Sequence, residues 1–205
     1  QIFNQFYLDT TSMLAGTTCT KTDSELCKAV EQKFQHVITR KLRNLRVVYL
    51  QRAQCLKSMA FYKNVNLVSF TGPNLKTVGP WCFYDCKCLK IFRAPLEIVG
   101  ESAFCNCCSL DVCTSEHVTN LGVSCFSNSG ITNFSSEFVK LIPRSCFQNS
   151  CLKIFVGRNL EQIDGLAFEN CKLNQFDSPI NTPVALSGQQ TPLNSEFNLD
   201  SQQQI

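Results

Sequence analysis

Ala103-Phe104-Cys105-Asn106-Cys107-Cys108-Ser109-Leu110 is the stretch that decides the fold, because its pattern returns six times along the chain. Each copy has a small residue, then a phenylalanine, and an aliphatic residue five or six positions later. The phenylalanines follow one another at intervals of 22, 21, 22, 21 and 21 residues: Phe61, Phe83, Phe104, Phe126, Phe147 and Phe168. A fixed period of this length indicates stacked structural repeats.

Further apolar columns show how each repeat is built. Three residues after the aliphatic position stand Phe70, Phe92, Cys113, Phe134, Phe155 and Phe176. Two more inward columns follow, as in Leu96 and Val99, and a turn-forming residue such as Gly100 comes next. The pattern predicts a short strand that begins at the aliphatic residue, with its first, fourth and sixth positions facing the core. The small sixth residue is Gly, Ala or Ser in every copy.

Strand positions three and five then face outward, because side chains alternate across a strand. Most residues at these positions are small or polar, but several are aliphatic and one is cationic. Stacking of parallel strands would align them into a strip on the concave face of the solenoid. The predicted ligand-binding residues are Ile91, Arg93, Val112, Thr114, Ile154 and Val156. The competing interpretation is that branched residues suit strands anywhere and that scattered apolar residues are ordinary on surfaces.

At two repeats the chain resembles a known family. Residues 103–110 and the segment Ala167-Phe168-Glu169-Asn170-Cys171-Lys172-Leu173 are similar to the Ala-Phe-x-Asn-Cys-x-Ser-Leu core of BspA-like leucine-rich repeats. The resemblance covers about residues 42–179. It implies an α/β leucine-rich repeat solenoid, with a curved parallel β-sheet on the concave side and short turns on the convex side. The family includes surface adhesins and antigens, and it has no catalytic residues to transfer. We expect no cofactor and no metal.

The segments that flank the repeats have a different composition. Thr22-Asp23-Ser24-Glu25 has the spacing of a capping box, and an apolar stripe follows it, so a helix is expected over about residues 23–39. This helix would cover the open end of the solenoid. The expected organisation is an N-terminal segment at 1–41, repeats at 42–179, and a disordered tail at 180–205 that is rich in Gln, Asn and Ser.

The 14 cysteines raise the question of cross-links. Cys82, Cys125 and Cys146 occupy the small position before phenylalanine, and Cys86, Cys107 and Cys171 share a turn column. Since alanine or serine fills these columns in other repeats, the favoured interpretation is a set of buried, reduced thiols. Disulfides between adjacent coils remain open. A zinc site among the cysteines of residues 86–108 also remains open, although paired CxxC spacing is absent.

Other functions find less support in the sequence. The basic stretch Arg40, Lys41, Arg43, Arg46 and Arg52 offers a site for nucleic acid or an anionic surface. No base-stacking aromatic residues accompany these charges, so nucleic acid is not the expected partner. The two histidines, His36 and His117, lack a neighbouring nucleophile and acid, and phosphate-binding loops are absent. No enzyme activity is expected.

The sequence therefore favours a non-catalytic scaffold that binds a protein partner through its concave face, with a surface-displayed adhesin or antigen as the alternative. No run of 18 apolar residues predicts a transmembrane helix. The sequon Asn133-Phe134-Ser135 lies on a predicted strand, where a glycan would obstruct the outward face. We expect a cytoplasmic location for the chain as given, and a cell-surface or secreted one if a signal peptide precedes it. Oligomeric state is left open.

Overall fold

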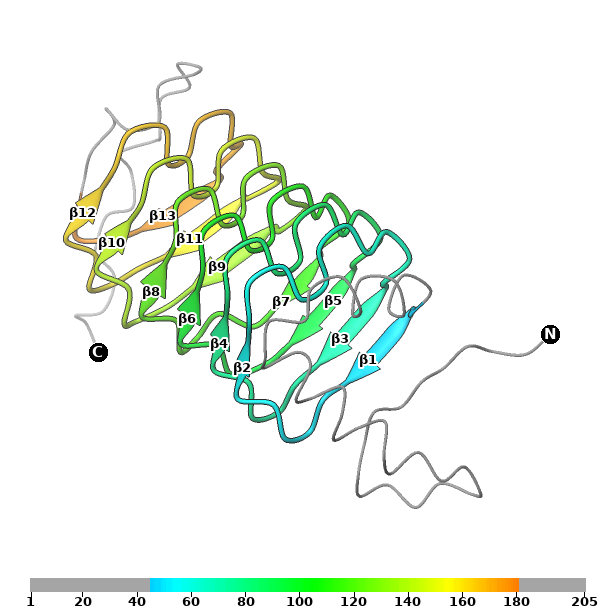
Figure 1. Cartoon of the computed structure of the whole chain (residues 1–205). Helices are drawn as coiled ribbons and strands as arrows, with labels where there is room; N and C mark the ends of the chain where they lie inside the picture. Colours follow the sequence, from blue (N-terminus) through cyan, green and yellow to red (C-terminus); the bar gives the residue numbers. More distant parts are fainter. Residues whose placement is uncertain (1–44, 181–205) are drawn as a thin grey trace, which may run out of the picture.

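A computed structural model describes residues 45–180. This part of the chain forms a solenoid of about six coils, stacked in one row with all strands parallel (Figure 1). It contains strands and turns and no helix. The helix expected at about 23–39 and the tail after residue 180 lie outside the described residues.

One side of every coil is the predicted strand. These strands form the first ladder, in two hydrogen-bonded groups ordered β1-β3-β5-β7 and β9-β11-β13. Their bounds are β1 Val47–Tyr49, β3 Ser69–Thr71, β5 Ile91–Arg93, β7 Val112–Cys113, β9 Asn133–Ser135, β11 Ile154–Val156 and β13 Gln175–Asp177. Residues at the predicted inward positions are buried or partly buried: Leu89, Phe92 and Ala94 are buried, and Cys113 and Phe176 are partly buried. The strand parity read from the sequence is therefore confirmed.

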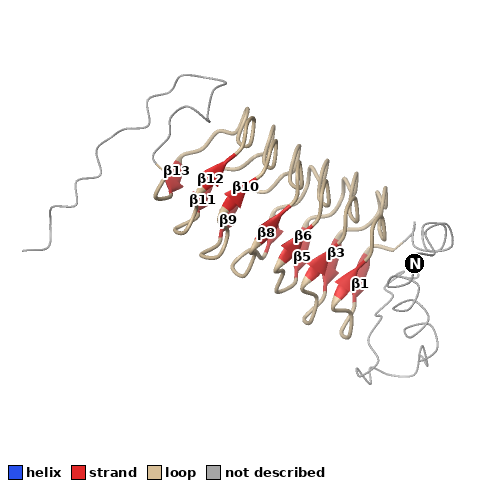
Figure 2. Cartoon of the chain, turned by 60° about the vertical axis from the view of Figure 1, so that its left-hand side comes forward, coloured by secondary structure: helices blue, strands red, loops and turns tan. Residues whose placement is uncertain are grey.

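A second ladder corrects the expectation that only short turns complete each coil. Two-residue parallel strands occupy the column that ends in Val78 and Val99, and Figure 1 shows them in a row apart from the first ladder. Figure 2 shows that strands, in red, and loops, in tan, make up the described coils. They are β2 Cys55–Leu56, β4 Thr77–Val78, β6 Ile98–Val99, β8 Asn120–Leu121, β10 Leu141–Ile142 and β12 Gln162–Ile163. Gly100 follows β6 because the coils approach closely there: a Cβ atom on it would lie 2.6 Å from the backbone nitrogen of Pro80.

The third side of each coil carries the phenylalanine of the repeat signature and is built from turns. Backbone hydrogen bonds still join successive coils there, as from Phe83 N to Ala103 O at 2.8 Å. Two residues per coil have positive φ. One such column contains Lys63, Asp85, Asn106, Asn128, Asn149 and Asn170. Asparagine and aspartate adopt this left-handed conformation more readily than most residues, which explains the Asn of the repeat signature.

Two columns of aromatic rings fill the interior. Phe83 stacks on Phe104, with ring planes 1° apart and centroids 5.3 Å apart. Rings of the strand column, such as Phe92, meet them edge-on at 76°. Burial of these rings is a major contribution to stability, at about 2 kcal/mol each before entropy costs. The solenoid thus has a continuous core, which fixes the register between the strands of successive coils.

Candidate recognition surface

The predicted binding residues lie on the outer face of the first ladder. Ile91 pairs in register with Ser69 on one side and Val112 on the other. Ile154 pairs with Asn133 and Gln175, and Val156 lies two residues further along the same strand. The four aliphatic residues are half-buried, while Arg93 and Thr114 are exposed. All six are therefore on the face that strand parity assigns to them.

The aliphatic residues form two groups instead of one strip. Ile91 and Val112 are neighbours on β5 and β7, but exposed Asn133 and Ser135 of β9 separate them from Ile154 and Val156. The first group also has Arg93 beside it on β5. The structure thus brings Ile91, Arg93 and Val112 together and leaves Ile154 and Val156 as a second, smaller patch.

The first ladder is interrupted between β7 and β9, and Cys113 is the residue that differs there. It occupies the column that phenylalanine fills in the other repeats, so the stack that includes Phe70 and Phe92 ends before it. Side-chain hydroxyls replace the missing strand pairing. Ser115 Oγ accepts from Ser135 N at 3.1 Å and donates to Ser135 O at 3.0 Å.

Thr114 has a similar bridging role. Its Oγ1 accepts a hydrogen bond from Ala94 N at 3.0 Å and also donates to Ala94 O. Both hydrogen-bonding functions of the hydroxyl are used within the protein. A partner at this face would therefore meet the methyl group of Thr114, and the hydroxyl would act by positioning the strand.

A hollow lies at the turn by which the chain passes from the first ladder to the second. In neighbouring coils this turn closes with a bond from residue i+3 to residue i, as from Leu75 N to Gly72 O. At Pro95 the bond runs from Leu96 N to Ala94 O, 2.8 Å, and spans one residue fewer. The fixed φ of proline suits such a three-residue γ-turn. An open hollow of about 330 Å³ lies beside this shortened turn and is lined by Thr71, Pro73, Arg93, Pro95, Glu116 and His117, among others.

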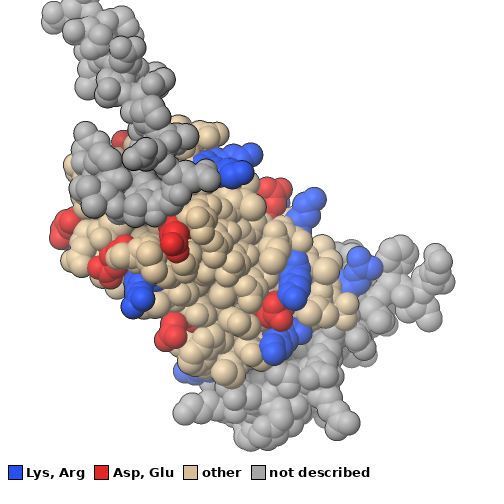
Figure 3. All heavy atoms as spheres, turned by 90° about the horizontal axis from the view of Figure 1, so that it is seen from above, with Lys and Arg blue, Asp and Glu red and all other residues tan. Residues whose placement is uncertain are grey.

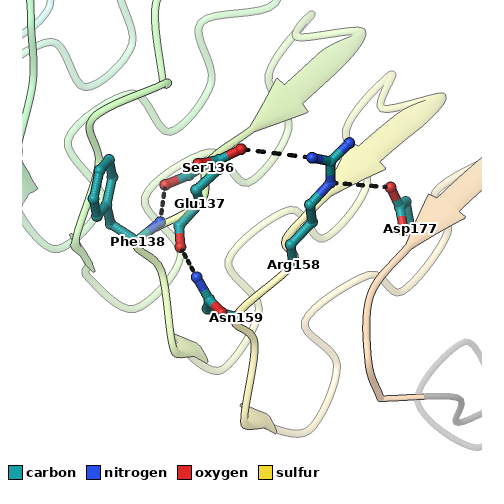
Figure 4. A network of polar contacts seen from close by, with 6 residues as sticks. All are labelled: Ser136, Glu137, Phe138, Arg158, Asn159 and Asp177. Atoms are coloured by element: carbon teal, nitrogen blue, oxygen red, sulfur yellow. Dashed lines mark hydrogen bonds and ion pairs between the residues drawn. The ribbon is translucent and has the colours of Figure 1, made fainter.

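Arg93 is an unpaired charge at this hollow. Within residues 45–180 it forms no ion pair. Arg158, three coils further on, differs: its guanidinium lies 3.6 Å from Glu137 Oε1 and 3.7 Å from Asp177 Oδ2 (Figure 4). Pairing of surface ions contributes little to stability, but an unpaired cation beside apolar groups is available to a partner carboxylate.

Sequence reasoning missed the exposed apolar residues outside the first ladder. Ile98 and Leu141 face outward on the second ladder and are 43% and 41% exposed. Phe138, in the turn after β9, is 54% exposed and lies beside a second open hollow of about 450 Å³. The alternation of Ile98 with inward Val99 could have indicated the second ladder, but two residues are too few for a periodic signal.

The described cysteines are free thiols, and their burial follows the columns. Cys86 and Cys107 are fully buried and donate to Phe61 O and Phe83 O at 3.0 and 3.1 Å. Burial raises the pKa of Cys86 to about 12. Cys88, Cys108 and Cys151 are exposed, so the expectation of burial does not extend to them. No three His, Cys, Asp or Glu residues between 45 and 180 are grouped as a metal site would require.

Charges of both signs are scattered over the surface. In the view of Figure 3, acidic and basic side chains alternate with uncharged residues. Of the predicted basic stretch, the described residues are Arg46, just before β1, and Arg52, three residues after its end. His117 is exposed in its turn, as expected.

Comparison with known families explains the repeat. The family described as BspA type Leucine rich repeat region matches residues 40–153 and 91–184, in 6 copies. The chain belongs to this BspA-type family. The small residue, the Phe and the Leu of its repeat are buried in the core of this structure. The Asn of its repeat has the left-handed backbone conformation. A search of curated proteins found no match to the BspA-type chain. No helix within residues 45–180 is long and apolar enough to cross a membrane.

Proposed function

We propose that this BspA-type chain is a non-catalytic scaffold that binds a protein partner through the outer face of its first ladder. The observation that carries the proposal is the group Ile91, Arg93 and Val112. Two half-buried aliphatic side chains lie in register beside an exposed, unpaired cation and an open hollow. Protein interfaces combine apolar area with arginine in this way.

The rigidity of the surface supports binding. The inward neighbours of this group, Leu89, Phe92 and Leu110, have no exposed area, so the strands are fixed from beneath. A preformed surface loses little conformational entropy when a partner binds. The γ-turn at Pro95 and the internal bonds of Thr114 hold the rim of the hollow in the same way.

Ile154 and Val156 form a second contact region in this proposal. A partner that spans from β5 to β11 crosses three strand spacings of the solenoid, and two of them separate β7 from β11. At about 4.8 Å per spacing, the whole span is about 14 Å, within the reach of one standard interface.

A photo-crosslinking amino acid at position 135 tests the proposal. Ser135 is exposed on β9, between the two aliphatic groups, so the substitution leaves both groups in place. Asn120, exposed on β8 of the second ladder, is the matched control position. In a native cell extract, we expect covalent protein adducts from position 135 and few from position 120. Equal adducts at both positions, or none at 135, would contradict the proposal.

A further inference from the structure

We propose that the partner presents an extended polypeptide segment along the corner between the two ladders, with a carboxylate against Arg93 and an apolar side chain, four residues away in that segment, against Phe138. This corner consists of the turn residues 95, 116–117, 137–138 and 158–159. The inference rests on the proposed function and adds the chemistry of the partner.

Arg93 is the residue that would bind the carboxylate of the partner segment. It is exposed at the hollow, and the walls beside it are formed by the apolar rings of Pro73 and Pro95. An arginine fork binds a carboxylate with two parallel hydrogen bonds, and nearby apolar walls strengthen such a pair by excluding water. Glu116 lies on the rim one coil further on, outside ion-pair distance of Arg93. It disfavours a second acidic residue at that point of the segment.

Phe138 is the residue that would contact the apolar side chain of the partner segment. At 54% exposure it is the most exposed of the large hydrophobic side chains in the described chain. Its backbone is held in place, because Phe138 N donates to Ser136 Oγ at 3.1 Å and Ser136 Oγ donates to Val118 O at 2.6 Å. The ring points away from the charged network of Arg158 in Figure 4. Its nearest aromatic neighbour is His117, with ring centroids 6.4 Å apart.

The hollow beside Phe138 offers no free charge to a ligand. Arg158 lies between Glu137 and Asp177, and Lys140 Nζ is 2.7 Å from Glu161 Oε1. Leu160 and Pro179 add apolar surface to the same hollow. Charge complementarity therefore places the acidic residue of the partner at Arg93 and its uncharged residue at Phe138.

The coil geometry sets the spacing of the two residues. Arg93 and Phe138 belong to coils two steps apart, which is about 10 Å along the stack at about 4.8 Å per step. Ser135 ends β9 as Arg93 ends β5, and Phe138 comes three residues after Ser135, an offset of at most about 10 Å. The two displacements combined give a separation of about 13 Å, or four residues of an extended chain at about 3.3 Å each. Side chains four residues apart also lie on the same face of an extended chain.

Random dodecapeptides displayed on phage provide the probe, selected against the intact chain. We expect enrichment of peptides with Asp or Glu four positions from a large apolar residue. The best of them, as labelled synthetic peptides, should bind at least tenfold more weakly to Arg93→Ser and to Phe138→Ser than to the unchanged chain. Arg144→Ser and Leu141→Ser remove an exposed arginine and an exposed aliphatic residue elsewhere and should leave the dissociation constant unchanged.

The other outcomes separate this inference from the proposed function. Peptides whose binding is lost in Ile91→Ser with Val112→Ser, but unchanged in Phe138→Ser, would overturn the corner site and leave the proposed function standing. Absence of any enrichment would overturn the extended-segment partner, while the crosslinking experiment at position 135 decides the proposed function separately. Analytical ultracentrifugation of the chain alone tests whether a second copy of the chain occupies the corner. A concentration-dependent dimer that Phe138→Ser abolishes would assign the corner to that second copy and overturn the peptide partner.

Discussion

Phe104 and Phe83 occupy the same position of successive coils and stack with ring planes 1° apart and centroids 5.3 Å apart. Phe126 continues the stack on the other side of Phe104 at the same centroid distance. The stacked phenylalanine rings, which recur at a fixed period in the sequence, therefore fix the register between successive coils from inside the core. Function at the surface depends on this register, because it aligns the outward residues of the strands.

Replacement of Phe104 by alanine should destabilise the chain by about 3 to 5 kcal/mol, the usual cost of removing a buried aromatic ring. Phe104 has no exposed area and contacts Phe83, Phe92 and Phe126. Hydrogen exchange should show the largest loss of protection in the flanking coils, since repeat coupling is mainly between neighbours. Phe138→Ala is the control. It removes a ring that is 54% exposed and should change stability by less than about 1 kcal/mol.

The left-handed column predicts opposite effects of two small substitutions at Asn106, which has a φ of 62°. Asn106→Ala should lower the free energy of unfolding by about 1 kcal/mol, because alanine is strained in this conformation. Asn106→Gly should be close to neutral, because glycine adopts positive φ without steric cost. Urea denaturation of the two variants measures the difference. Equal stability of the two would mean that the backbone conformation at this column does not explain the repeated asparagine.

Thiol titration should separate the exposed cysteines of the described chain from the buried ones. Cys88, Cys108 and Cys151 are exposed and should react with an aromatic disulfide reagent within minutes in the folded protein. Cys82, Cys86, Cys107, Cys125 and Cys146 are buried and should react only after unfolding without reductant. Cys125 and Cys146 are the most stringent test, since their sulfur atoms lie 3.4 Å apart. Failure of this pair to react after unfolding would reveal a disulfide.

Alkaline pH should destabilise the chain through the same buried thiols. Burial raises the pKa of Cys86 from its ordinary value of 9.0 to about 12, and the pKa of Cys107 is also well above that value. The unfolded thiols therefore lose protons first, and stability is retained below pH 9 and lost as pH rises from 9 toward 12. Each such cysteine contributes about 1.4 kcal/mol per pH unit in this window.

Chemical denaturation at pH 8 and pH 10 measures this effect. The loss of stability between the two pH values should be smaller in Cys86→Ala than in the unchanged chain. Cys108→Ala, which removes an exposed thiol, should retain the full loss. The same pH dependence in all three proteins would exclude a contribution from Cys86.

Much of the fold follows from the sequence because the core is periodic. The inward columns are buried in most coils, including a first coil with Leu45, Val48, Ala53 and Leu56 that lacks the repeat signature. Members such as Cys113, Leu173 and Phe176 are partly buried. The second ladder was not predicted, since strands of two residues such as Ile98–Val99 are joined by backbone bonds between coils, which side-chain patterns do not encode.

The candidate site was predicted in part. Strand parity placed Ile91, Arg93 and Val112 on one face. It did not indicate the hollow beside Pro95, where the loss of one residue reads as a small change in repeat length. The bridging role of Thr114 was not predicted, because a hydroxyl that bonds to the backbone of the preceding coil leaves no periodic signal in the sequence. Phe138 was missed because turn residues have no fixed inward or outward side in a strand pattern.

The most direct test of the proposed recognition face compares two double variants for capture of proteins from a native extract. Ile91→Ser with Val112→Ser alters the first ladder, and Ile98→Ser with Leu141→Ser removes exposed aliphatic residues of the second ladder. Circular dichroism should confirm that both variants remain folded. The account predicts that the first variant loses most of the partner captured by the unchanged chain and that the second retains it. Retention by the first variant and loss by the second would contradict the account and assign recognition to the second ladder.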